Sequence, residues 1–378
     1  MPDHTPTPPL RVAILGAASI ARKTAPAILG AGHTIACVSS RSLARAQAVV
    51  DACELASSGT VARGGGGGGG LHAAALGDPS VTAVYIPAPA GHHAPLVCAA
   101  AAAGKHILLE KPVSLGEADL SAMVAAVQAA GVVLFDGTMW PFHPRAAALA
   151  AALPSLGAPL KSVHATLAFH GGPRFEAADI RTRPGDDGLG CVGDLGWYCV
   201  RAGLWAFGGG SVDPADPPAS ATAHAGAVLN AGGVPLTAGA TVVWPDGRYL
   251  SFDTSFQRAP VQRLEVAGTE GAVSLSDFVL PDNPVGQATF MLAAPVGAGD
   301  PDALPDVNPA TRLVSVEATE PQEVGLWRAF GAAVAAKNKG DGAPAADALG
   351  AAVATQRVLN AVMESLRTGG ATVNVVRD

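Results

Sequence analysis

The chain has 378 residues, and its 24 Lys and Arg against 31 Asp and Glu give a formal net charge of −7. Because the balance is acidic and the basic residues are scattered, nucleic acid and anionic membranes are disfavoured as partners. The longest apolar stretch, around 95–104, is much shorter than the roughly 18–20 residues that cross a bilayer. We therefore expect a globular protein without a membrane span, and the length predicts about two domains.

The cysteines indicate the redox environment. The five of them are scattered, with no Cys-x-x-Cys or His-x-x-x-His spacing, so neither a metal site nor a disulfide framework is predicted. Reduced thiols favour a cytoplasmic location. The proline-rich residues 1–9 lack the basic and apolar regions of a signal peptide, and we expect them to be a disordered lead-in.

Residues 10–137 alternate between short apolar runs and helical patterns. The apolar runs predict strands at 10–15, 34–38, 81–86, 106–109 and 132–135. The helical patterns cover 20–29, 93–103 and 117–130. Strands that are apolar throughout and alternate with helices are typical of a parallel sheet covered on both faces. The prediction for this half is an α/β domain with a Rossmann-type, doubly wound parallel sheet.

From residue 138 onward, strand-like segments follow one another with few helices between them. They lie at 163–169, 221–229, 236–244, 250–256, 263–267 and 272–275, and two helical patterns close the chain at 321–335 and 346–366. Successive strands without crossover helices predict a mostly antiparallel sheet. We therefore expect residues 138–378 to form an α+β domain on an open, mostly antiparallel sheet.

Seven consecutive glycines, Gly64–Gly70, interrupt the first half of the chain. A flexible phosphate-binding loop is one interpretation, but no Lys-Ser/Thr pair follows the run and no strand directly precedes it. The favoured interpretation is a low-complexity surface insert.

The turn after the first predicted strand resembles a dinucleotide-binding pattern. Gly16 and Ala21 fit the spacing G-x-G-x-x-G/A, with Ala18 in place of the second glycine. Small residues here let backbone N–H groups and the helix N-terminus approach a pyrophosphate. We expect these contacts from Gly16, Ala17, Ala18, Ser19 and Ile20. The pattern alone is weak, because any strand–helix unit can begin in this way.

The end of the second predicted strand indicates which dinucleotide binds. An NAD site usually carries Asp or Glu there, whereas this chain has Ser39, Ser40 and Arg41 and no acid before Asp51. A hydroxyl beside a guanidinium suits a 2′-phosphate, which a carboxylate would repel. We therefore predict NADP(H), bound by Ser40 and Arg41, rather than NAD(H). The alternative is an ordinary start of a helix.

Glu110-Lys111-Pro112 follows the predicted strand 106–109, at the sheet edge where ligands of doubly wound folds bind. The segment Gly104–Pro112 resembles the G-K-H-V-x-x-E-K-P signature of the Gfo/Idh/MocA family, named after glucose-fructose oxidoreductase and inositol dehydrogenase. Further segments match motifs of that family in the same order: Val84–His93, Met139–Pro144, Asp194–Tyr198 and Leu264–Gly271. The resemblance runs from about residue 10 to residue 366.

The resemblance implies a role for each matching residue. Lys111 matches the catalytic lysine, Tyr198 the acid/base residue and Asp194 its carboxylate partner, and a cis peptide is expected before Pro112. The cofactor-side residues that it implies are Pro87, Pro89, His93, Glu110 and Lys111. Trp140 matches an aromatic residue that lines the substrate pocket together with Tyr198, although a core role explains Trp140 equally well.

The chemistry of these residue types agrees with those roles. Asp194 and Tyr198 are four residues apart, so on a helix they share a face. A phenol with a pKa of about 10 is a poor base, but a neighbouring Lys111 ammonium would lower that pKa. Oxidation would then move a proton to Tyr198 while a hydride moves to the nicotinamide. The alternative is a capped helix with a buried tyrosine and a solvated aspartate.

The expected function is that of an NADP(H)-dependent oxidoreductase acting on a small sugar, polyol or cyclic diol. The motifs are most similar to a plant and algal branch near dimeric dihydrodiol dehydrogenase and NADP-dependent xylose dehydrogenase. A homodimer is expected, because an open sheet leaves an apolar face to cover. Ala90, Pro141 and the glycine run depart from the family pattern, so a catalytically decayed dinucleotide-binding sensor or scaffold is the alternative.

Overall fold

The structure is a computed structural model, and it describes residues 8–65, 72–293 and 310–377. Most of the predicted lead-in and of the glycine run lies outside the described residues. The chain forms two compact units, Met1–Met139 with Glu323–Ala352 and Trp140–Gln322 with Val353–Asp378. The sequence pattern assigned residues 323–352 to the C-terminal domain, and the structure corrects this, because they belong to the first unit.

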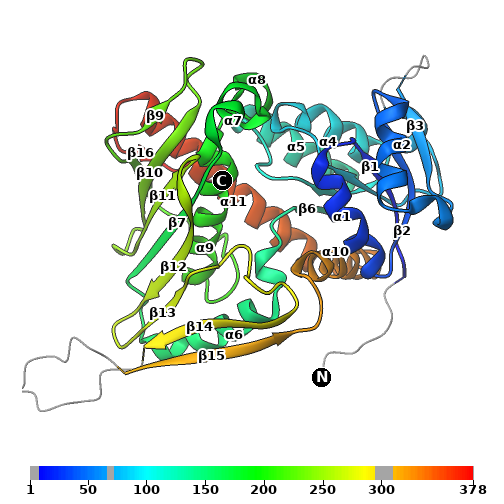
Figure 1. Cartoon of the computed structure of the whole chain (residues 1–378). Helices are drawn as coiled ribbons and strands as arrows, with labels where there is room; N and C mark the ends of the chain where they lie inside the picture. Colours follow the sequence, from blue (N-terminus) through cyan, green and yellow to red (C-terminus); the bar gives the residue numbers. More distant parts are fainter. Residues whose placement is uncertain (1–7, 66–71, 294–309, 378) are drawn as a thin grey trace, which may run out of the picture. The chain divides into compact units, whose positions relative to one another are not determined.

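The first unit holds a six-stranded parallel sheet (Figure 1). In sheet order its strands are β3 (Val61–Gly64), β2 (Thr34–Ser40), β1 (Arg11–Leu15), β4 (Ala83–Ile86), β5 (His106–Leu109) and β6 (Leu134–Asp136). The strands β1, β4 and β5 are almost wholly buried, as their continuous apolar runs predicted. The strand order reverses between β1 and β4, where doubly wound sheets bind their ligands. The prediction of a Rossmann-type sheet is confirmed.

Helices of the first unit connect these strands, and one comes from far along the chain. They are α1 (Ser19–Gly30), α2 (Leu43–Ala52), α3 (Ala73–Leu76), α4 (His93–Ala102), α5 (Glu117–Ala130) and most of α10 (Gln322–Asn338), and the start of α11 (Ala343–Arg367) also belongs to this unit. Apolar side chains on one side of α10, among them Trp327 and Phe330, are buried. The rings of Trp327 and Tyr85 are 5.9 Å apart, and those of Phe330 and Phe135 are 5.5 Å apart. These aromatic contacts explain why α10 joins the first unit.

The second unit holds a ten-stranded sheet. In sheet order its strands are β15 (Thr311–Ala318), β14 (Gly286–Ala293), β13 (Ala272–Leu275), β12 (Gln257–Ala267), β7 (Ser162–His170), β11 (Tyr249–Ser255), β10 (Pro235–Val243), β8 (Ser220–Ala223) and β16 (Val373–Asn374), with β9 (Val228–Leu229) beside β10. Among the described residues, every pair is antiparallel except β7 with β11. The mostly antiparallel prediction is confirmed.

One face of this sheet is covered by α6 (Pro144–Ala152), α9 (Trp197–Phe207) and the second half of α11 (Ala343–Arg367). The other helices of this unit, α7 (Gly172–Ala178) and α8 (Pro184–Asp187), have no buried residues. The α9 backbone lies close to β11, since a Cβ at Gly203 would be 2.9 Å from Leu250 Cδ2. The short helical turns of the chain are η1 (Leu55–Ser58), η2 (Ala90–His92), η3 (Trp140–Phe142), η4 (Leu153–Leu156), η5 (Ile180–Thr182) and η6 (Val192–Gly196). None of the helices in the described ranges is long and apolar enough to cross a membrane.

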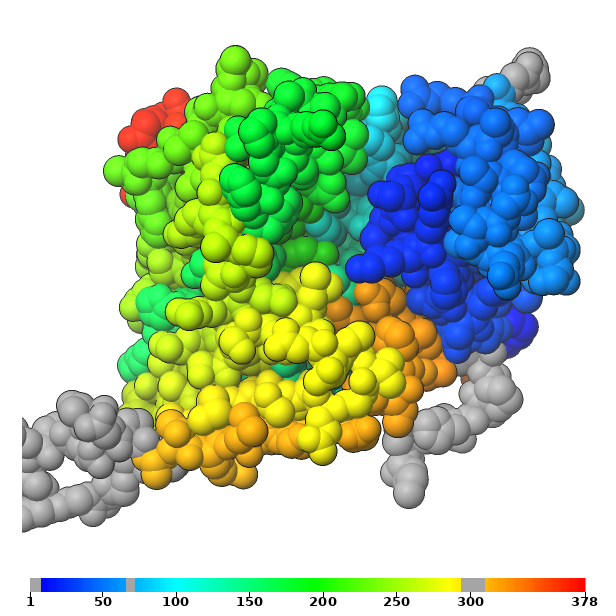
Figure 2. All heavy atoms as spheres, in the orientation of Figure 1, coloured from blue at the N-terminus to red at the C-terminus, as the bar shows by residue number. Residues whose placement is uncertain are grey.

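The other face of the ten-stranded sheet is polar, so the expected apolar face is wrong. Its outward side chains include His164, Thr166, Arg263 and Glu265, which line a shallow hollow of about 500 Å³. Some apolar side chains also line this hollow, among them Leu313, which is 62% exposed, and its cross-strand neighbour Met291. Figure 2 shows β14 and β15, yellow to orange, at the surface of this unit. The strands alternate between buried apolar and outward polar residues, and this alternation makes the face polar.

Candidate active site

The turn between β1 and α1 has the geometry of a phosphate-binding turn. Gly16 has a φ of +145°, and its N–H donates to the Ser39 carbonyl oxygen at 2.8 Å. A Cβ on Gly16 would lie 3.3 Å from Pro87 Cγ, so a larger residue would be strained by the backbone conformation and would crowd Pro87. Ala18 provides no side-chain cap for α1, and the first turn of that helix carries no acid. The positive end of α1 is therefore suited to an anionic group.

The end of β2 carries the residues predicted to meet a 2′-phosphate. Ser40 is buried and its hydroxyl accepts the Ser42 N–H at 3.4 Å, whereas Arg41 is exposed. Beside them, His72 Nδ1 lies 2.8 Å from the Ser39 hydroxyl oxygen, and burial lowers the pKa of His72 to about 4. No sequence pattern singles out His72, because its partner is 33 residues away. The neutral His72 imidazole therefore contacts the end of β2 through Ser39, directly before Ser40 and Arg41.

His93 is completely buried at the start of α4. Its Nε2 lies 2.7 Å from the Ala88 carbonyl oxygen and its Nδ1 lies 3.1 Å from that of Val113. Burial lowers the pKa of His93 to about 4, so the ring is neutral at pH 7. Because both nitrogens face the backbone, His93 ties the loop after β4 to the segment after Lys111. A contact with the cofactor, as the resemblance implied, would have to use the ring carbon atoms.

The Glu110-Lys111-Pro112 turn lies at the end of β5, and its Lys111–Pro112 peptide is cis, as the resemblance implied. The Tyr85 hydroxyl donates to Glu110 Oε1 at 2.6 Å and lies 3.1 Å from the Thr24 hydroxyl oxygen. Burial raises the pKa of Glu110, and the Tyr85 hydrogen bond and the Lys111 charge oppose that rise. Glu110 is thus held by β4 directly beside Lys111. Tyr85 lies within a matched motif, but no pattern reveals its partner.

Most of the residues predicted in the first unit meet at one edge of the parallel sheet. They lie at the carboxyl ends of β2, β1, β4 and β5, which are four consecutive strands in the sheet. The residues at this edge are Gly16, Ala17, Ala18, Ser19, Ile20, Ser40, Arg41, Pro87, Pro89, Glu110 and Lys111. This is the edge at which open α/β sheets bind ligands.

Asp194 and Tyr198 lie in one continuous helical segment of the second unit. Asp194 is in the π turn η6, which runs directly into α9, where Tyr198 is buried. Asp194 Oδ2 is 3.0 Å from Arg181 Nε, and Arg181 Nη1 is 3.2 Å from Asp179 Oδ1. The charges of Asp194 and Asp179 raise the pKa of Arg181 above its usual value. The expectation of a merely solvated aspartate is therefore excluded.

A second cation is buried one helical turn after Tyr198. Arg201 is 6% exposed, its Nε donates to the Thr355 hydroxyl oxygen at 2.7 Å, and its guanidinium carbon lies 5.5 Å from the centre of the Trp197 ring. No sequence pattern identified this arginine. Within the described parts of the chain there is no group of three or more His, Cys, Asp or Glu side chains that could hold a metal ion.

Trp140 is packed in the interior of the second unit. Its ring centre lies 5.1 Å from that of Trp205 and 6.3 Å from that of Phe278, and 3% of the residue is exposed. These contacts support the core role that the sequence left open. A substrate contact of Trp140 stays a prediction.

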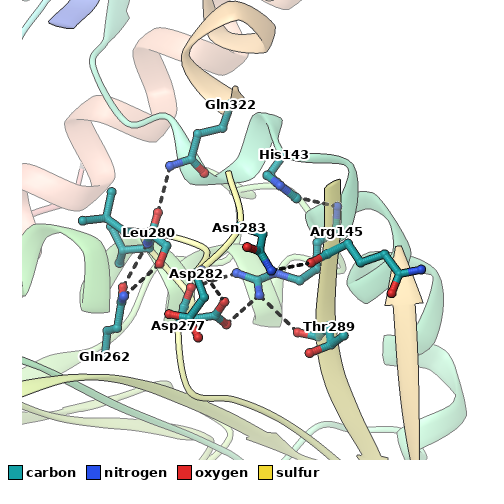
Figure 3. Close-up of polar contacts among 11 residues, drawn as sticks. His143, Arg145, Gln262, Asp277, Leu280, Asp282, Asn283, Thr289 and Gln322 are labelled. Carbon is teal, nitrogen blue, oxygen red and sulfur yellow. Dashed lines mark hydrogen bonds and ion pairs between the residues drawn. The ribbon is translucent and has the colours of Figure 1, made fainter. Parts of the chain in front are cut away.

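The residue that follows the Met139–Pro144 motif makes a buried ion pair that was not predicted (Figure 3). Arg145 is 2% exposed, and its Nη1 donates to Asp277 Oδ1 at 2.6 Å and to the Thr289 carbonyl oxygen at 3.1 Å. Its Nη2 donates to the Asp277 carbonyl oxygen at 2.8 Å. Asp277 Oδ2 in turn accepts the Asp282 N–H at 3.0 Å. This ion pair fixes the loop between β13 and β14 against α6.

Two family models match the chain. The model described as the oxidoreductase family with an NAD-binding Rossmann fold, GFO_IDH_MocA, matches residues 10–138. The model of the GFO/IDH/MocA C-terminal domain matches residues 155–274. Together they cover more than half of the chain, one in each unit.

Curated relatives match over part of the chain. A D-xylose 1-dehydrogenase (NADP(+)) of Haloferax volcanii is 40% identical over 193 residues, which are 50% of this chain and 54% of the relative. The trans-1,2-dihydrobenzene-1,2-diol dehydrogenase of Mus musculus is 28% identical over 205 residues, which are 54% of this chain and 58% of the relative. The chain thus spans little more than half the length of these relatives.

Solved structures share the fold of the whole chain. A 3-ketoreductase from Actinomadura kijaniata, in complex with NADP and TDP-benzene, has a TM-score of 0.73 at 24% identity and covers 96% of this chain and 98% of its own. An aldose-aldose oxidoreductase from Caulobacter crescentus, complexed with glycerol, has a TM-score of 0.76 at 20% identity and covers 97% and 99%. At this identity the likeness establishes the fold alone.

Proposed function

Because the chain belongs to the Gfo/Idh/MocA family of oxidoreductases, we propose that it is an NADP(H)-dependent enzyme that transfers a hydride to or from a small sugar, polyol or cyclic diol. The observation that carries the proposal is the Glu110-Lys111-Pro112 turn at the ligand-binding edge of the Rossmann sheet. The Tyr85 hydroxyl donates a hydrogen bond to Glu110 at this edge, and this bond fixes the residue that precedes Lys111 at the end of β5.

The nucleotide-binding edge supports NADP(H). The Gly16 turn suits a pyrophosphate, because it leads into the N-terminus of α1, which has no side-chain cap and no acid in its first turn. Ser40 and the exposed Arg41 suit a 2′-phosphate, and no carboxylate stands at the end of β2 to repel it. The name of the Haloferax relative, which specifies NADP(+), favours the same cofactor. When bound, the nicotinamide supplies the hydride acceptor or donor.

The proposed roles of the chain's own residues follow from their chemistry. Lys111 donates a hydrogen bond to the reacting oxygen of the substrate, and its charge favours the phenolate of Tyr198. Tyr198 accepts the hydroxyl proton during oxidation and returns it during reduction. Asp194 orients Tyr198 from one helical turn away. Trp140 stays a candidate for the wall of the substrate pocket.

The substrate class is proposed from the relatives. A D-xylose 1-dehydrogenase-like oxidation at a sugar C1 and a trans-dihydrodiol dehydrogenase-like oxidation are the two leading reactions, as the names of two relatives suggest. The higher identity of the xylose enzyme favours the sugar.

A substrate screen tests the proposal. NADP⁺ reduction is measured at 340 nm over aldoses, inositols and cyclic diols, with NAD⁺ in parallel. We expect turnover with NADP⁺, and a loss of at least about 100-fold in Lys111→Met and Tyr198→Phe. Full activity in either variant would refute the mechanism. Binding of NADPH without turnover across the whole panel would instead favour a decayed sensor or scaffold.

We also propose a cytoplasmic homodimer that forms through the exposed face of the ten-stranded sheet. Because that face is polar, the interface would rest on hydrogen bonds and ion pairs of residues such as Arg263 and Glu265. The five cysteines are free thiols, which favours a reducing compartment. Light scattering is expected to give the mass of a dimer, and Arg263→Glu to weaken it. A monomer at all concentrations would refute the dimer.

A further inference from the structure

Arg181 bridges two carboxylates in the second unit. Its Nε contacts Asp194 at 3.0 Å and its Nη1 contacts Asp179 at 3.2 Å. Asp179 Oδ1 also accepts the Arg181 backbone N–H at 3.0 Å, and this bond caps the turn η5. The position of the guanidinium is therefore set by a local turn as well as by its ion pairs.

The contact matters because Asp194 lies one helical turn before Tyr198. The π turn η6 ends and α9 begins between the two residues, and such turns are frequent at functional sites. Side chains one turn apart on a helix have Cβ atoms about 5–6 Å apart. An unbalanced carboxylate at that separation would disfavour the phenolate and raise the pKa of Tyr198.

We propose that Arg181 is a positioning residue of the reaction, because it balances the charge of Asp194 and lets Asp194 orient Tyr198 without weakening the phenol as a proton acceptor. The inference rests on the proposed function. The Asp194 side chain is 13% exposed and that of Arg181 is 37% exposed, so solvent screens the pair in part, though less than it would screen a pair of fully exposed side chains. Arg181 acts through Asp194 and is assigned no contact with the substrate.

The same segment offers a matched control. Arg183 is two residues further on, carries the same charge and has a side chain that is 55% exposed. Its ion pair is with Asp186, at 3.7 Å. Replacement of Arg183 by Gln therefore removes an equal charge from the same loop without removing the cation at Asp194.

The pKa of Tyr198 can be measured without any substrate. The chain has three tyrosines, so ¹³C labelling at tyrosine Cζ gives three signals, and Tyr198→Phe identifies the one of interest. A pH titration of the full-length protein then follows that signal. We expect Arg181→Gln to raise the pKa of Tyr198 by about one unit. Arg181→Lys should restore most of the change, and Arg183→Gln should cause none.

A double variant separates charge balance from a structural role. Asp194→Asn is expected to lower the pKa of Tyr198, and Arg181→Gln combined with Asp194→Asn to bring it back toward the wild-type value. If Arg181 only stabilised the fold of its loop, the two single variants would not shift the pKa of Tyr198 in opposite directions. The other ionisable groups in these surroundings are Asp179, Cys191, Cys199, Arg201 and Asp253, with Lys111 added by the proposed mechanism, and they are the same in every variant.

Kinetics provide the second readout once a substrate is known. In Arg181→Gln the acidic limb of the pH profile of kcat/KM for oxidation should shift to higher pH by about one unit, the same as the Tyr198 pKa. The rate near pH 7 should therefore fall about tenfold and recover at higher pH. The dissociation constant for NADPH should not change. An unchanged Tyr198 pKa in Arg181→Gln, or an equal shift in Arg183→Gln, would overturn the inference. A protein without turnover refutes the proposed function, and the titration still decides the role of Arg181.

Discussion

The variant Tyr85→Phe removes one hydroxyl from the interior of the first unit. That hydroxyl donates to Glu110 Oε1 at 2.6 Å and lies 3.1 Å from the Thr24 hydroxyl oxygen, and Tyr85 has no exposed surface. A hydrogen bond to a charged group contributes about 1.5–3 kcal/mol, and its loss leaves a part-buried carboxylate poorly satisfied. We expect Tyr85→Phe to lower the free energy of unfolding by about 2–3 kcal/mol near pH 8.

The expected loss of unfolding free energy in Tyr85→Phe depends on pH, because it depends on the charge of Glu110. Burial raises its pKa in the folded protein, and the Tyr85 hydroxyl opposes that rise, so its removal raises the folded-state pKa further. A folded-state pKa above the unfolded value means that stability falls as the pH rises between the two values. The difference in unfolding free energy between variant and wild type is therefore largest near pH 8 and shrinks as the carboxyl becomes protonated.

Urea denaturation followed by circular dichroism at several pH values measures this difference. Tyr249→Phe is the matched control, because Tyr249 is 36% exposed and its ring lies edge-to-face with the ring of the exposed His164. We expect the control to change the unfolding free energy by less than about 0.5 kcal/mol. A loss in Tyr85→Phe that is independent of pH, or no larger than in the control, would refute this account of Glu110.

Three further predictions concern the two buried histidines, the Gly16 turn and the Arg145–Asp277 ion pair. Burial lowers the pKa of both His72 and His93 to about 4, so the free energy of unfolding should fall as the pH drops below about 6.5. In His72→Asn the slope of the unfolding free energy against pH should be smaller by about 1 kcal/mol per pH unit. An unchanged slope in urea titrations would contradict this. Gly16→Val should weaken NADPH binding at least about tenfold in fluorescence titrations while the protein stays folded, and unchanged affinity would exclude the Gly16 turn as the phosphate site. Arg145→Met should cost about 3 kcal/mol of unfolding free energy, because it leaves the Asp277 carboxylate unpaired. Asp277→Asn in the same chain should recover part of that loss, and purely additive effects would argue against the ion pair.

Local sequence determined much of the first unit. Strands β1, β4 and β5 are buried on both faces, so their apolar runs are continuous and could be found without knowledge of the fold. The Gly16 turn and the position of Lys111 after β5 follow from the same strand–helix alternation. Strand β3 was not predicted, because its residues are only part-buried and do not form a continuous apolar run.

Only the tertiary structure decided which distant residues meet. No periodicity pairs Tyr85 with Glu110, His72 with Ser39 or Arg181 with Asp194, because each partner comes from a different element. The same holds for α10, whose aromatic side chains pack in the first unit although the residues that precede it in sequence belong to the second. The physical reason is that the free energy of a polar or aromatic contact depends on burial and geometry, and these exist only after the chain has brought the two groups together.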